Sequence, residues 1–409
     1  MKKLVLGLAA VTLGLCTLAS CGGVAKENKI GVIIAGSAGD ETKGYQTRWE
    51  ALAKEYGYEM VYEKFKGQDP AYYGECADKL IAAGVKGIIC NFEMDGKEAV
   101  IEKCINEEVY IGYSGSTVDE ETFKEFENEP YFIGQISPTP ETEEKQAYDM
   151  TKYIVDKYYG PNAVAKPEGT NGLAIWPVDF HGITLAHQMT YRYKGIKKAL
   201  KEYGVTIVGD NDDDSAKWSA TYTNDSILKD QILIMGNNMA DYNALQQQCE
   251  NVLSKNPVAV VSTCMADNLL GMFATKGSMT KGTSFGTLDA FVNDYSKWYK
   301  ADADNEVPAF RVKHDPYVAG KFSAINEGIL AIMLRAINGD PVRSANGGDV
   351  SINQNYWVVK TLEEYEAAAN TSLNFAWTKA DFDGIKDEAA LQALYDNATL
   401  ENLTNALNK

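Results

Sequence analysis

Positive charge is scarce in this sequence. Its 409 residues contain Lys+Arg 39 against Asp+Glu 57, a formal net charge of -18 at pH 7. Nucleic-acid binding depends on basic patches that neutralise phosphates, so this balance argues against a nucleic-acid partner. An acidic surface that keeps a folded chain in solution is the simpler use of the excess carboxylates.

Cysteine and histidine are also few. The chain has seven cysteines and three histidines, and no two cysteines form a C-x-x-C pair. Structural metal clusters and disulfide frameworks both need closely spaced or paired ligands. We therefore expect no metal, no cofactor and no disulfide framework. Beyond the N-terminus, the cysteines should be small buried hydrophobic residues, namely Cys76, Cys90, Cys104, Cys249 and Cys264.

Long apolar runs are missing as well, except at the N-terminus. There, Lys2 and Lys3 precede a short apolar run that ends in Leu-Ala-Ser-Cys at residues 18–21. This pattern resembles a bacterial lipoprotein signal, in which Cys21 becomes the lipid-bearing first residue. We predict a signal peptide at 1–20, a flexible linker at 21–28 and an extracytoplasmic protein anchored to the cell membrane by lipid. An ordinary signal peptide with a chance cysteine is the alternative.

Apolar runs of strand length alternate with segments of helical period. The first series has strands at 29–35, 58–62, 87–90, 109–113 and 131–136, with helices at 44–56, 71–83, 97–107 and 141–158. The second has strands at 173–176, 205–208, 258–262, 284–287 and 310–312, with helices at 185–203, 241–254, 266–276 and 317–337. Continuous hydrophobicity in strands indicates parallel sheets covered on both faces. The sequence thus predicts an α/β fold with two doubly wound lobes.

The segment after residue 341 is harder to place. A strand at 356–359 and helices near 362–370 and 388–407 fit its pattern.

Three motifs follow one another along the chain. They are R-x-x-G at 192–195, F-G-x-x-D at 285–289 and V-x-x-D-P-Y-x-x-G at 312–320. With the order of elements, they resemble the type I periplasmic solute-binding proteins of ABC transporters, the ribose- and galactose-binding branch most closely. The resemblance covers about residues 29–339.

That family implies two lobes that close on a small solute. They would be joined by three crossings, near 131–137, 288–291 and 312–315. The N-terminal lobe would then contain residues 29–134 plus 289–313. The C-terminal lobe would contain 135–288 plus 314–409, with the extended tail packed across its hinge side.

The resemblance also implies site residues. Sugar hydroxyls need donors and acceptors in forked geometry, and an aromatic ring can cover the apolar face of a sugar. Carried over by motif, Arg192 would donate to hydroxyls, Asp289 would accept from them, and His314 would stand where the family often has an amide. A hinge salt bridge or a solvated surface position is the alternative for each.

Other candidates rest on position alone, because ligands of open α/β sheets collect beyond the carboxyl ends of strands. We select Tyr45 and Phe180 as stacking platforms and expect Trp49 to be a core residue. The remaining ligand-binding candidates in these loops are Asp40, Asn91, Ser114, Asp179, His181, Asp267 and Asn268.

One departure from the family pattern concerns the ligand. The sugar-binding branch often carries Asp-Arg after the fourth strand, where this chain has Ser114 and Gly115. The particular sugar is therefore open, and nucleosides, polyols and furanone-like signals are alternatives.

The resulting hypothesis is a monomeric, lipid-anchored solute-binding protein that is not an enzyme. It would capture a small sugar-like solute and deliver it to the permease subunits of an ABC importer. A ligand-presenting sensor subunit for a membrane receptor is the main alternative. A transcription regulator would need an N-terminal helix-turn-helix, where this chain has a signal-like segment.

Two chemical patterns in the sequence offer alternatives to this hypothesis. Residues 112–116 nearly match G-x-S-x-G, so a hydrolase with Ser114 as nucleophile would need His181, His187 or His314 as its base. Residues 210–214 have the D-x-D-x-D spacing of a calcium loop but lack its glycine and its final glutamate. We expect a strand exit in the first case and a solvated acidic turn in the second.

Overall fold

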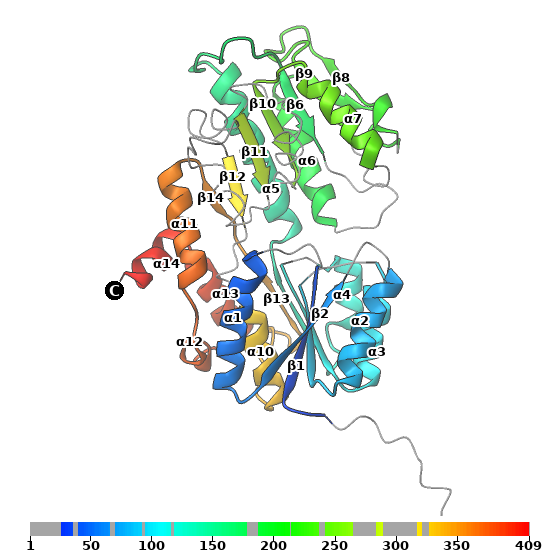
Figure 1. The fold of residues 1–409 in the computed structure, drawn as a ribbon, viewed down its shortest axis with the longest axis vertical. Coiled ribbons are helices and arrows are strands. Elements are labelled where there is room, and N and C mark those ends of the chain that lie inside the picture. The colour runs from blue at the N-terminus through cyan, green and yellow to red at the C-terminus, as the bar shows by residue number, and fades with distance from the viewer. Residues whose placement is uncertain are drawn as a thin grey trace, which may run out of the picture.

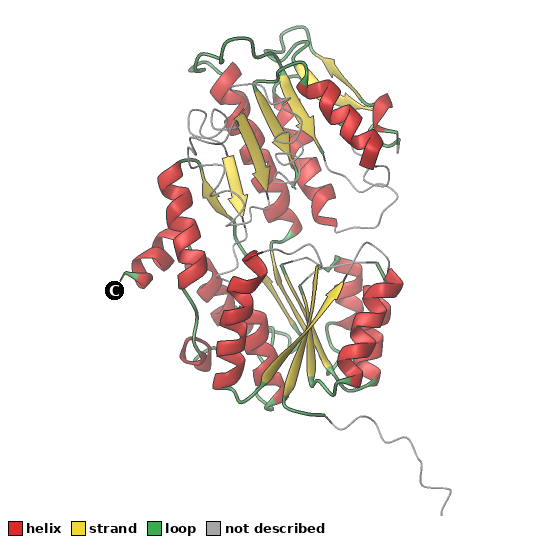
Figure 2. Cartoon of the chain, in the orientation of Figure 1, coloured by secondary structure: helices red, strands yellow, loops and turns green. Residues whose placement is uncertain are grey.

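A computed structural model describes residues 26–35, 40–65, 70–91, 95–115, 118–177, 187–212, 214–236, 242–264, 284–288, 317–320 and 327–408. Two α/β lobes lie one beyond the other along the long axis, each built on a six-stranded sheet, and the C-terminal helices lie along one side (Figure 1). Figure 2 shows helices on both sides of each sheet. The predicted fold class, two doubly wound lobes joined by three crossings, is confirmed.

The first lobe is built on a wholly parallel sheet in the order β13-β5-β4-β3-β1-β2. Neighbouring residues of β1 pack on opposite faces: Ile33 lies in the cluster with Tyr73 and Leu80, and Ile34 in the one with Trp49. Strand side chains alternate between faces, so a strand covered on both sides must be apolar throughout. The strands are β1 (Lys29–Ala35), β2 (Glu59–Phe65), β3 (Gly87–Cys90), β4 (Tyr110–Ser114), β5 (Phe132–Ser137) and β13 (Val350–Asn353). The helices are α1 (Asp40–Glu55), α2 (Pro70–Ala82), α3 (Lys97–Asn106), α4 (Glu120–Phe126) and α10 (Glu327–Ile337).

The second lobe has the strand order β14-β12-β11-β10-β6-β9, parallel except for β14, which runs antiparallel to β12. The strands are β6 (Leu173–Trp176), β9 (Ile232–Ile234), β10 (Ala259–Ser262), β11 (Ser284–Leu288), β12 (Tyr317–Gly320) and β14 (Trp357–Val359). The helices are α5 (Pro140–Tyr159), α6 (His187–Glu202) and α7 (Tyr242–Leu253).

One predicted helix is wrong in its first part. The sequence predicts a single helix over 317–337, but Tyr317–Gly320 is the strand β12, and α10 begins only at Glu327. The strand is buried along its whole length between β11 and β14. An aromatic and a β-branched residue at its start fit a pleated, buried position better than a helix.

The predicted strand at 205–208 exists, but it lies outside the large sheet. β7 (Val205–Val208) pairs antiparallel with β8 (Ser219–Tyr222), and a short turn η1 (Ser215–Lys217) lies between them. Its residues alternate between buried and exposed, which is typical of a hairpin with one solvated face. The place beside β6 is taken by β9, which the sequence analysis missed along with α4, β8 and β13.

Along the described elements, the chain changes from one lobe to the other three times. The first passage leads from β5 into α5, and the third leads from β13 into β14. These two lie side by side, because Gln354 N–H donates to the Ser137 carbonyl and Thr139 N–H donates to Asn353 Oδ1, each at 3.1 Å. Together they form a hydrogen-bonded pair of hinge segments.

The second passage differs from the predicted boundaries. It lies between β12 and α10, at residues outside the described part of the chain. Because β11 and β12 are neighbours in one sheet, the chain is in the second lobe at both 288 and 317. α10 then packs on β3, β4, β5 and α1, so residues 327–353 belong to the first lobe and not to the second. An almost fully buried helix can cover either sheet, so its composition alone does not reveal its partner.

Gly134 explains how β13 joins the sheet. The β4–β5 register shifts around this residue, its φ is +91°, and a Cβ there would lie 1.9 Å from the carbonyl oxygen of Val350. Only glycine combines this conformation with such close approach of a neighbouring strand.

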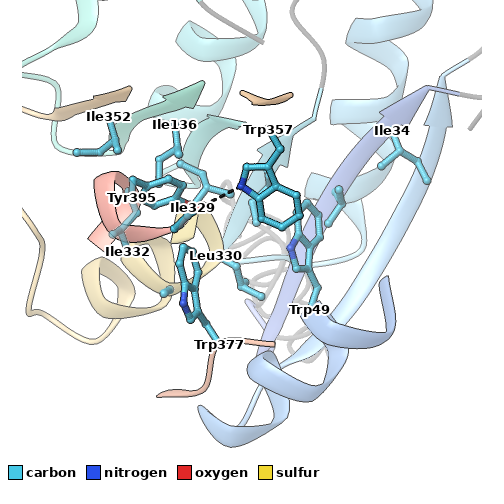
Figure 3. Packing of buried hydrophobic residues seen from close by; sticks show 14 of the residues in the cluster. Ile34, Trp49, Ile136, Ile329, Leu330, Ile332, Ile352, Trp357, Trp377 and Tyr395 are labelled. Atoms are coloured by element: carbon cyan, nitrogen blue, oxygen red, sulfur yellow. Dashed lines mark hydrogen bonds between the residues drawn. The ribbon is translucent and has the colours of Figure 1, made fainter. Parts of the chain in front are cut away.

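The C-terminal tail packs mainly on the first lobe. Its helices are α11 (Leu362–Asn374), α12 (Lys379–Asp383), α13 (Glu388–Asn397) and α14 (Leu400–Leu407). Trp377 and Tyr395 cover Ile332 of α10 (Figure 3). Trp357 Nε1 donates to the Ala398 carbonyl at 2.8 Å, and α11 contacts both α1 and β14. The tail was expected on the second lobe, but its helices pack mainly on the first, and α11 also contacts β14 at the edge of the second lobe's sheet. None of the helices in the described part of the chain is both long and apolar enough to span a membrane.

Candidate functional site

The carboxyl ends of the two parallel sheets meet in the middle of the molecule. Strand arrows of the upper and lower lobes point toward one another in Figure 1. A hydrogen bond joins the two sides directly, from Gln188 Nε2 in the first turn of α6 to the carbonyl of Gly115 after β4, at 3.3 Å. This edge is where open α/β sheets hold their ligands.

Three neighbouring residues form the first-lobe side. Ser114 is the last residue of β4 and is fully buried. Gly115 has φ +75° and turns the chain out of the sheet, and the Asn91 side chain lies beside it, with Oδ1 3.5 Å from the place a Gly115 Cβ would occupy. Asn91 itself is held after β3, because its N–H donates to the Ile33 carbonyl at 3.0 Å. Two predicted ligand-binding residues, Asn91 and Ser114, therefore lie together at the facing edge.

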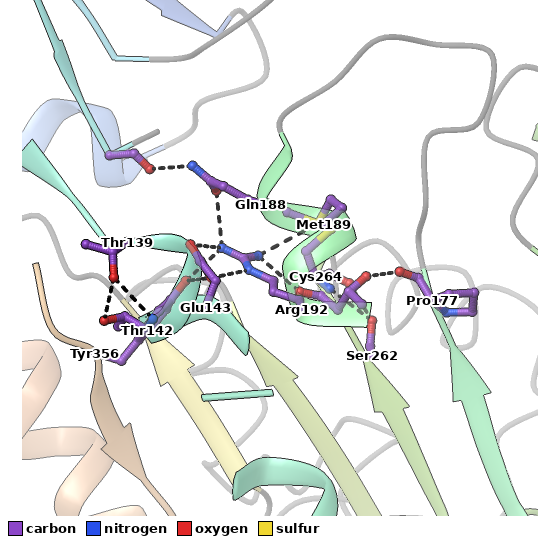
Figure 4. A network of polar contacts seen from close by, with 12 residues as sticks. Thr139, Thr142, Glu143, Pro177, Gln188, Met189, Arg192, Ser262, Cys264 and Tyr356 are labelled. Carbon is purple, nitrogen blue, oxygen red and sulfur yellow. Dashed lines mark hydrogen bonds and ion pairs between the residues drawn. The ribbon is translucent and has the colours of Figure 1, made fainter. Parts of the chain in front are cut away.

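The second-lobe side is a buried polar network centred on Arg192 (Figure 4). Arg192 Nε donates to Glu143 Oε2 at 2.7 Å, and Nη2 donates to Glu143 Oε1 at 3.2 Å. Nη2 also donates to the Tyr356 hydroxyl at 2.8 Å, and Nη1 donates to the Thr263 carbonyl at 3.0 Å. The Tyr356 hydroxyl in turn donates to Glu143 Oε2 at 2.6 Å. A bidentate arrangement of this kind gives a charge pair both strength and a fixed orientation.

Each member of the network is positioned by its own element. Glu143 lies in the first turn of α5, where a carboxylate is favoured by the helix dipole, and Thr139 caps that helix. Gln188 and Arg192 are four residues apart on α6, so they share one helix face, and Arg192 Nη2 donates to Gln188 Oε1 at 3.3 Å. Tyr356 comes from the third passage between the lobes.

Gly195, the glycine of the R-x-x-G motif, lies where α6 packs closely against α5. A Cβ at this position would lie 2.1 Å from the Glu144 carbonyl oxygen of α5. The absence of a side chain lets α6 pack close against α5, which brings Arg192 within reach of Glu143.

The structure describes only some of the predicted site residues. Arg192 lies in the N-terminal part of α6, and its guanidinium is fully buried and binds protein groups, so its predicted contact with a ligand stays a prediction. Trp49 is buried in the core, as predicted. Asp40 and Tyr45 belong to α1, but their side chains lie outside the described set. The other ligand-binding candidates lie outside the described part of the chain, so their roles stay predictions; they are Asp179, Phe180, His181, Asp267, Asn268, Asp289 and His314. Cys21, the predicted lipidation residue, also lies outside it.

Thr263 was a candidate from its loop position after β10, but three other residues of the network were missed. Of these, Gln188 could have been found, because it stands one helical turn before Arg192. Glu143 and Tyr356 could not, because they lie 49 and 164 residues from Arg192 and only the fold brings them near it.

The acidic turn at 210–214 uses its carboxylates locally. Asp210 accepts from Lys197 Nζ at 2.5 Å, and Asp212 pairs with Lys217 at 2.9 Å. Within the described residues, no group of three or more metal-binding side chains is arranged to hold a metal ion.

The described residues do not show a histidine beside Ser114 that would support the hydrolase alternative. Ser114 is fully buried, and its candidate bases His181 and His314 lie outside the described part of the chain. His187 begins α6, but its side chain is outside the described set.

Comparisons with protein-family models and with curated proteins find no match. Solved structures do share the fold. A 5-methylthioribose transporter solute-binding protein from Thermotoga lettingae, in complex with 5-methylthioribose, is 12% identical with a TM-score of 0.54, and the match covers 93% of this chain and 98% of that one. A protein from Mycobacterium smegmatis in complex with β-D-fucofuranose is 12% identical with a TM-score of 0.54, covering 84% of this chain and 97% of that one.

The fold is not confined to transport proteins. The transcription regulator CcpA of Lactococcus lactis is 12% identical with a TM-score of 0.50, covering 82% of this chain and 99% of that one. At such identities the likeness shows a common fold, and function has to be argued from the site.

Proposed function

We propose that this chain, which has the fold of the type I periplasmic binding proteins, is an extracytoplasmic solute-binding lipoprotein that closes its two lobes on a sugar-like solute and delivers it to an ABC importer. The protein acts as a monomer and binds its ligand without chemical change. Its lipid anchor is Cys21, exposed when residues 1–20 are removed.

The observation that carries this proposal is the meeting of two sheet edges across a hydrogen-bonded hinge. Asn91 and Ser114 lie at this edge in one lobe, and Gln188 and Thr263 lie at it in the other. Because the described hinge consists of short paired segments, the lobes can rotate about it while each core stays intact. A ligand that touches both lobes favours the closed arrangement, which is what a membrane partner would recognise.

The ligand class rests on chemistry and on the fold. Hydroxyl-rich solutes need side chains that both donate and accept, and Asn91 and Gln188 do both. Two structures that share the fold hold 5-methylthioribose and β-D-fucofuranose, which are sugars. We assign hydrogen bonding to Asp289 and His314, and stacking to Tyr45 and Phe180, at the same edge.

Thermal unfolding tests the proposal. The chain from residue 22 onward would be scanned against pentoses, hexoses, inositols, nucleosides and calcium. At a thousandfold excess over its dissociation constant, a ligand adds about 4 kcal/mol, a shift on the order of 10 °C. Asp289→Ala should remove the shift, whereas Asp396→Ala on the exposed face of α13 should keep it.

The outcomes separate the alternatives. A shift with one sugar that also supports growth fits delivery to an importer, and a shift with a compound that does not support growth points to the sensor subunit. No shift across the panel, together with hydrolysis of an ester substrate that Ser114→Ala abolishes, would replace the proposal with the enzyme alternative.

A further inference from the structure

Gln188 occupies a place that needs a side chain with both a hydrogen-bond donor and an acceptor. Its Nε2 faces the Gly115 carbonyl of the first lobe, and its Oε1 faces Arg192 Nη2 of the second, both at 3.3 Å. A backbone carbonyl can only accept, and a guanidinium can only donate. The group between them must donate at one end and accept at the other, which fixes the orientation of the Gln188 amide.

The Arg192 end of this bridge is rigid. The guanidinium is fully buried and held by Glu143, Tyr356 and the Thr263 carbonyl. Tyr356 belongs to the passage between β13 and β14, so the network ties α5, α6 and the hinge into one unit. From that unit, Gln188, which is only 4% exposed, donates a hydrogen bond to the opposite lobe away from the hinge.

The Gly115 end is equally defined. Gly115 N–H donates to the Ile136 carbonyl at 3.0 Å, which holds the turn against β5. The carbonyl that accepts from Gln188 therefore moves with the first lobe as a rigid group, so the hydrogen bond responds directly to the distance between the lobes.

We propose that Gln188 is a latch that holds the two lobes closed in the absence of ligand and that Arg192 positions it. The inference rests on the proposed function, because it requires that the lobes open and close. When the lobes separate, Gly115 exchanges Gln188 for water, so the latch is weak and reversible. One hydrogen bond of this kind shifts the ratio of closed to open molecules by about fivefold.

Gln188→Glu tests the latch most sharply. A carboxylate keeps an acceptor for Arg192 but replaces the donor that faces Gly115 with a second acceptor. Small-angle X-ray scattering of the ligand-free chain should then show a larger radius of gyration than the wild type, with a closed-to-open ratio at least about fivefold lower. Gln247→Glu makes the same charge change on the exposed face of α7 and should leave the radius unchanged.

Gln188→Met covers the case in which a new charge disturbs folding. It removes both hydrogen bonds with little change in volume, so it should also enlarge the ligand-free chain. If both variants keep the wild-type radius of gyration while folding cooperatively, the latch is excluded. Because the measurement uses no ligand, it can succeed or fail independently of the thermal panel.

Discussion

Arg192 and Glu143 form a fully buried ion pair, with Arg192 Nε 2.7 Å from Glu143 Oε2 and neither side chain exposed. The pair joins α6 to α5, and Tyr356 connects it to the hinge. Buried charges are costly unless paired, so the integrity of this network decides how firmly the second-lobe side of the site is held.

Removing one partner of the pair should be far more harmful than removing both. Glu143→Ala leaves the Arg192 charge buried and is expected to cost about 3–5 kcal/mol in urea unfolding. The double variant Glu143→Leu with Arg192→Met should recover much of that loss, because no charge is left unpaired. Equal stability of the single and double variants would show that the pair is not coupled.

The close approach of α5 and α6 at Gly195 gives a second prediction. Gly195→Ala places a Cβ against the backbone of Glu144, and overpacking of this kind should cost about 1–3 kcal/mol. Gly74→Ala is the matched control, since Gly74 lies within α2 with nothing within 4 Å of the added Cβ. That control should be stabilising by about 0.5–1 kcal/mol. Similar effects of the two changes would contradict the packing argument.

Arg48 belongs to a second buried ion pair and also ties the tail to the first lobe. Arg48 Nε donates to Glu327 Oε1 at 2.6 Å, and Arg48 also donates to the Ser372 carbonyl of α11. Glu327→Ala leaves the Arg48 charge buried and should therefore cost about 3–5 kcal/mol. Burial raises the pKa of Glu327 to about 7 despite the nearby Arg48 charge, so in Arg48→Met this carboxyl can take up a proton and the loss of stability should be smaller. Arg48→Met should also expose the tail to proteases, because it removes the donor to the Ser372 carbonyl. The reverse order of the two losses in urea unfolding would refute this account.

Asp119 should give the first lobe an acid-sensitive contact. Burial alone would raise the pKa of Asp119, but hydrogen bonds from the Thr122 backbone N–H and the Lys97 ammonium hold it at about 2. The folded-state pKa is depressed, so the stabilisation is present above the ordinary aspartate pKa of about 4 and is lost as pH falls toward 2. The stability difference between wild type and Asp119→Asn should shrink over that window. A difference that is constant with pH would show that the carboxylate charge plays no part.

The local hydrophobic pattern of the sequence predicted most of the fold. Apolar runs such as the one at β1 predicted the strands β1 to β5 of the first lobe, because a strand covered on both faces leaves a continuous hydrophobic signal. They did not predict α4 or β13. The same reasoning failed at Tyr317–Gly320, where pairing with β11 and β14 overrides the helical period of the residues that follow. It also failed for the tail, because Trp377 and Tyr395 are hydrophobic enough to pack on either lobe.

The site was predictable only where sequence position fixes spatial position. Asn91 and Ser114 end neighbouring parallel strands, so their meeting follows from topology. The partner of Arg192 does not, since Glu143 is 49 residues away and the approach depends on Gly195. The motif around Arg192 thus indicated an important position, while its contact in this structure is with a protein carboxylate.

Small-angle X-ray scattering with and without the sugar that gives the largest thermal shift tests the central claim most directly. If the chain binds its solute between the lobes, the radius of gyration of Gln188→Glu, which is enlarged without ligand, should fall on addition of the sugar. Adding Asp289→Ala to that variant should abolish both the fall and the heat of binding. The contrary result would be a sugar that binds Gln188→Glu with measurable heat but leaves its enlarged radius of gyration unchanged. That result would contradict closure of the lobes on a solute.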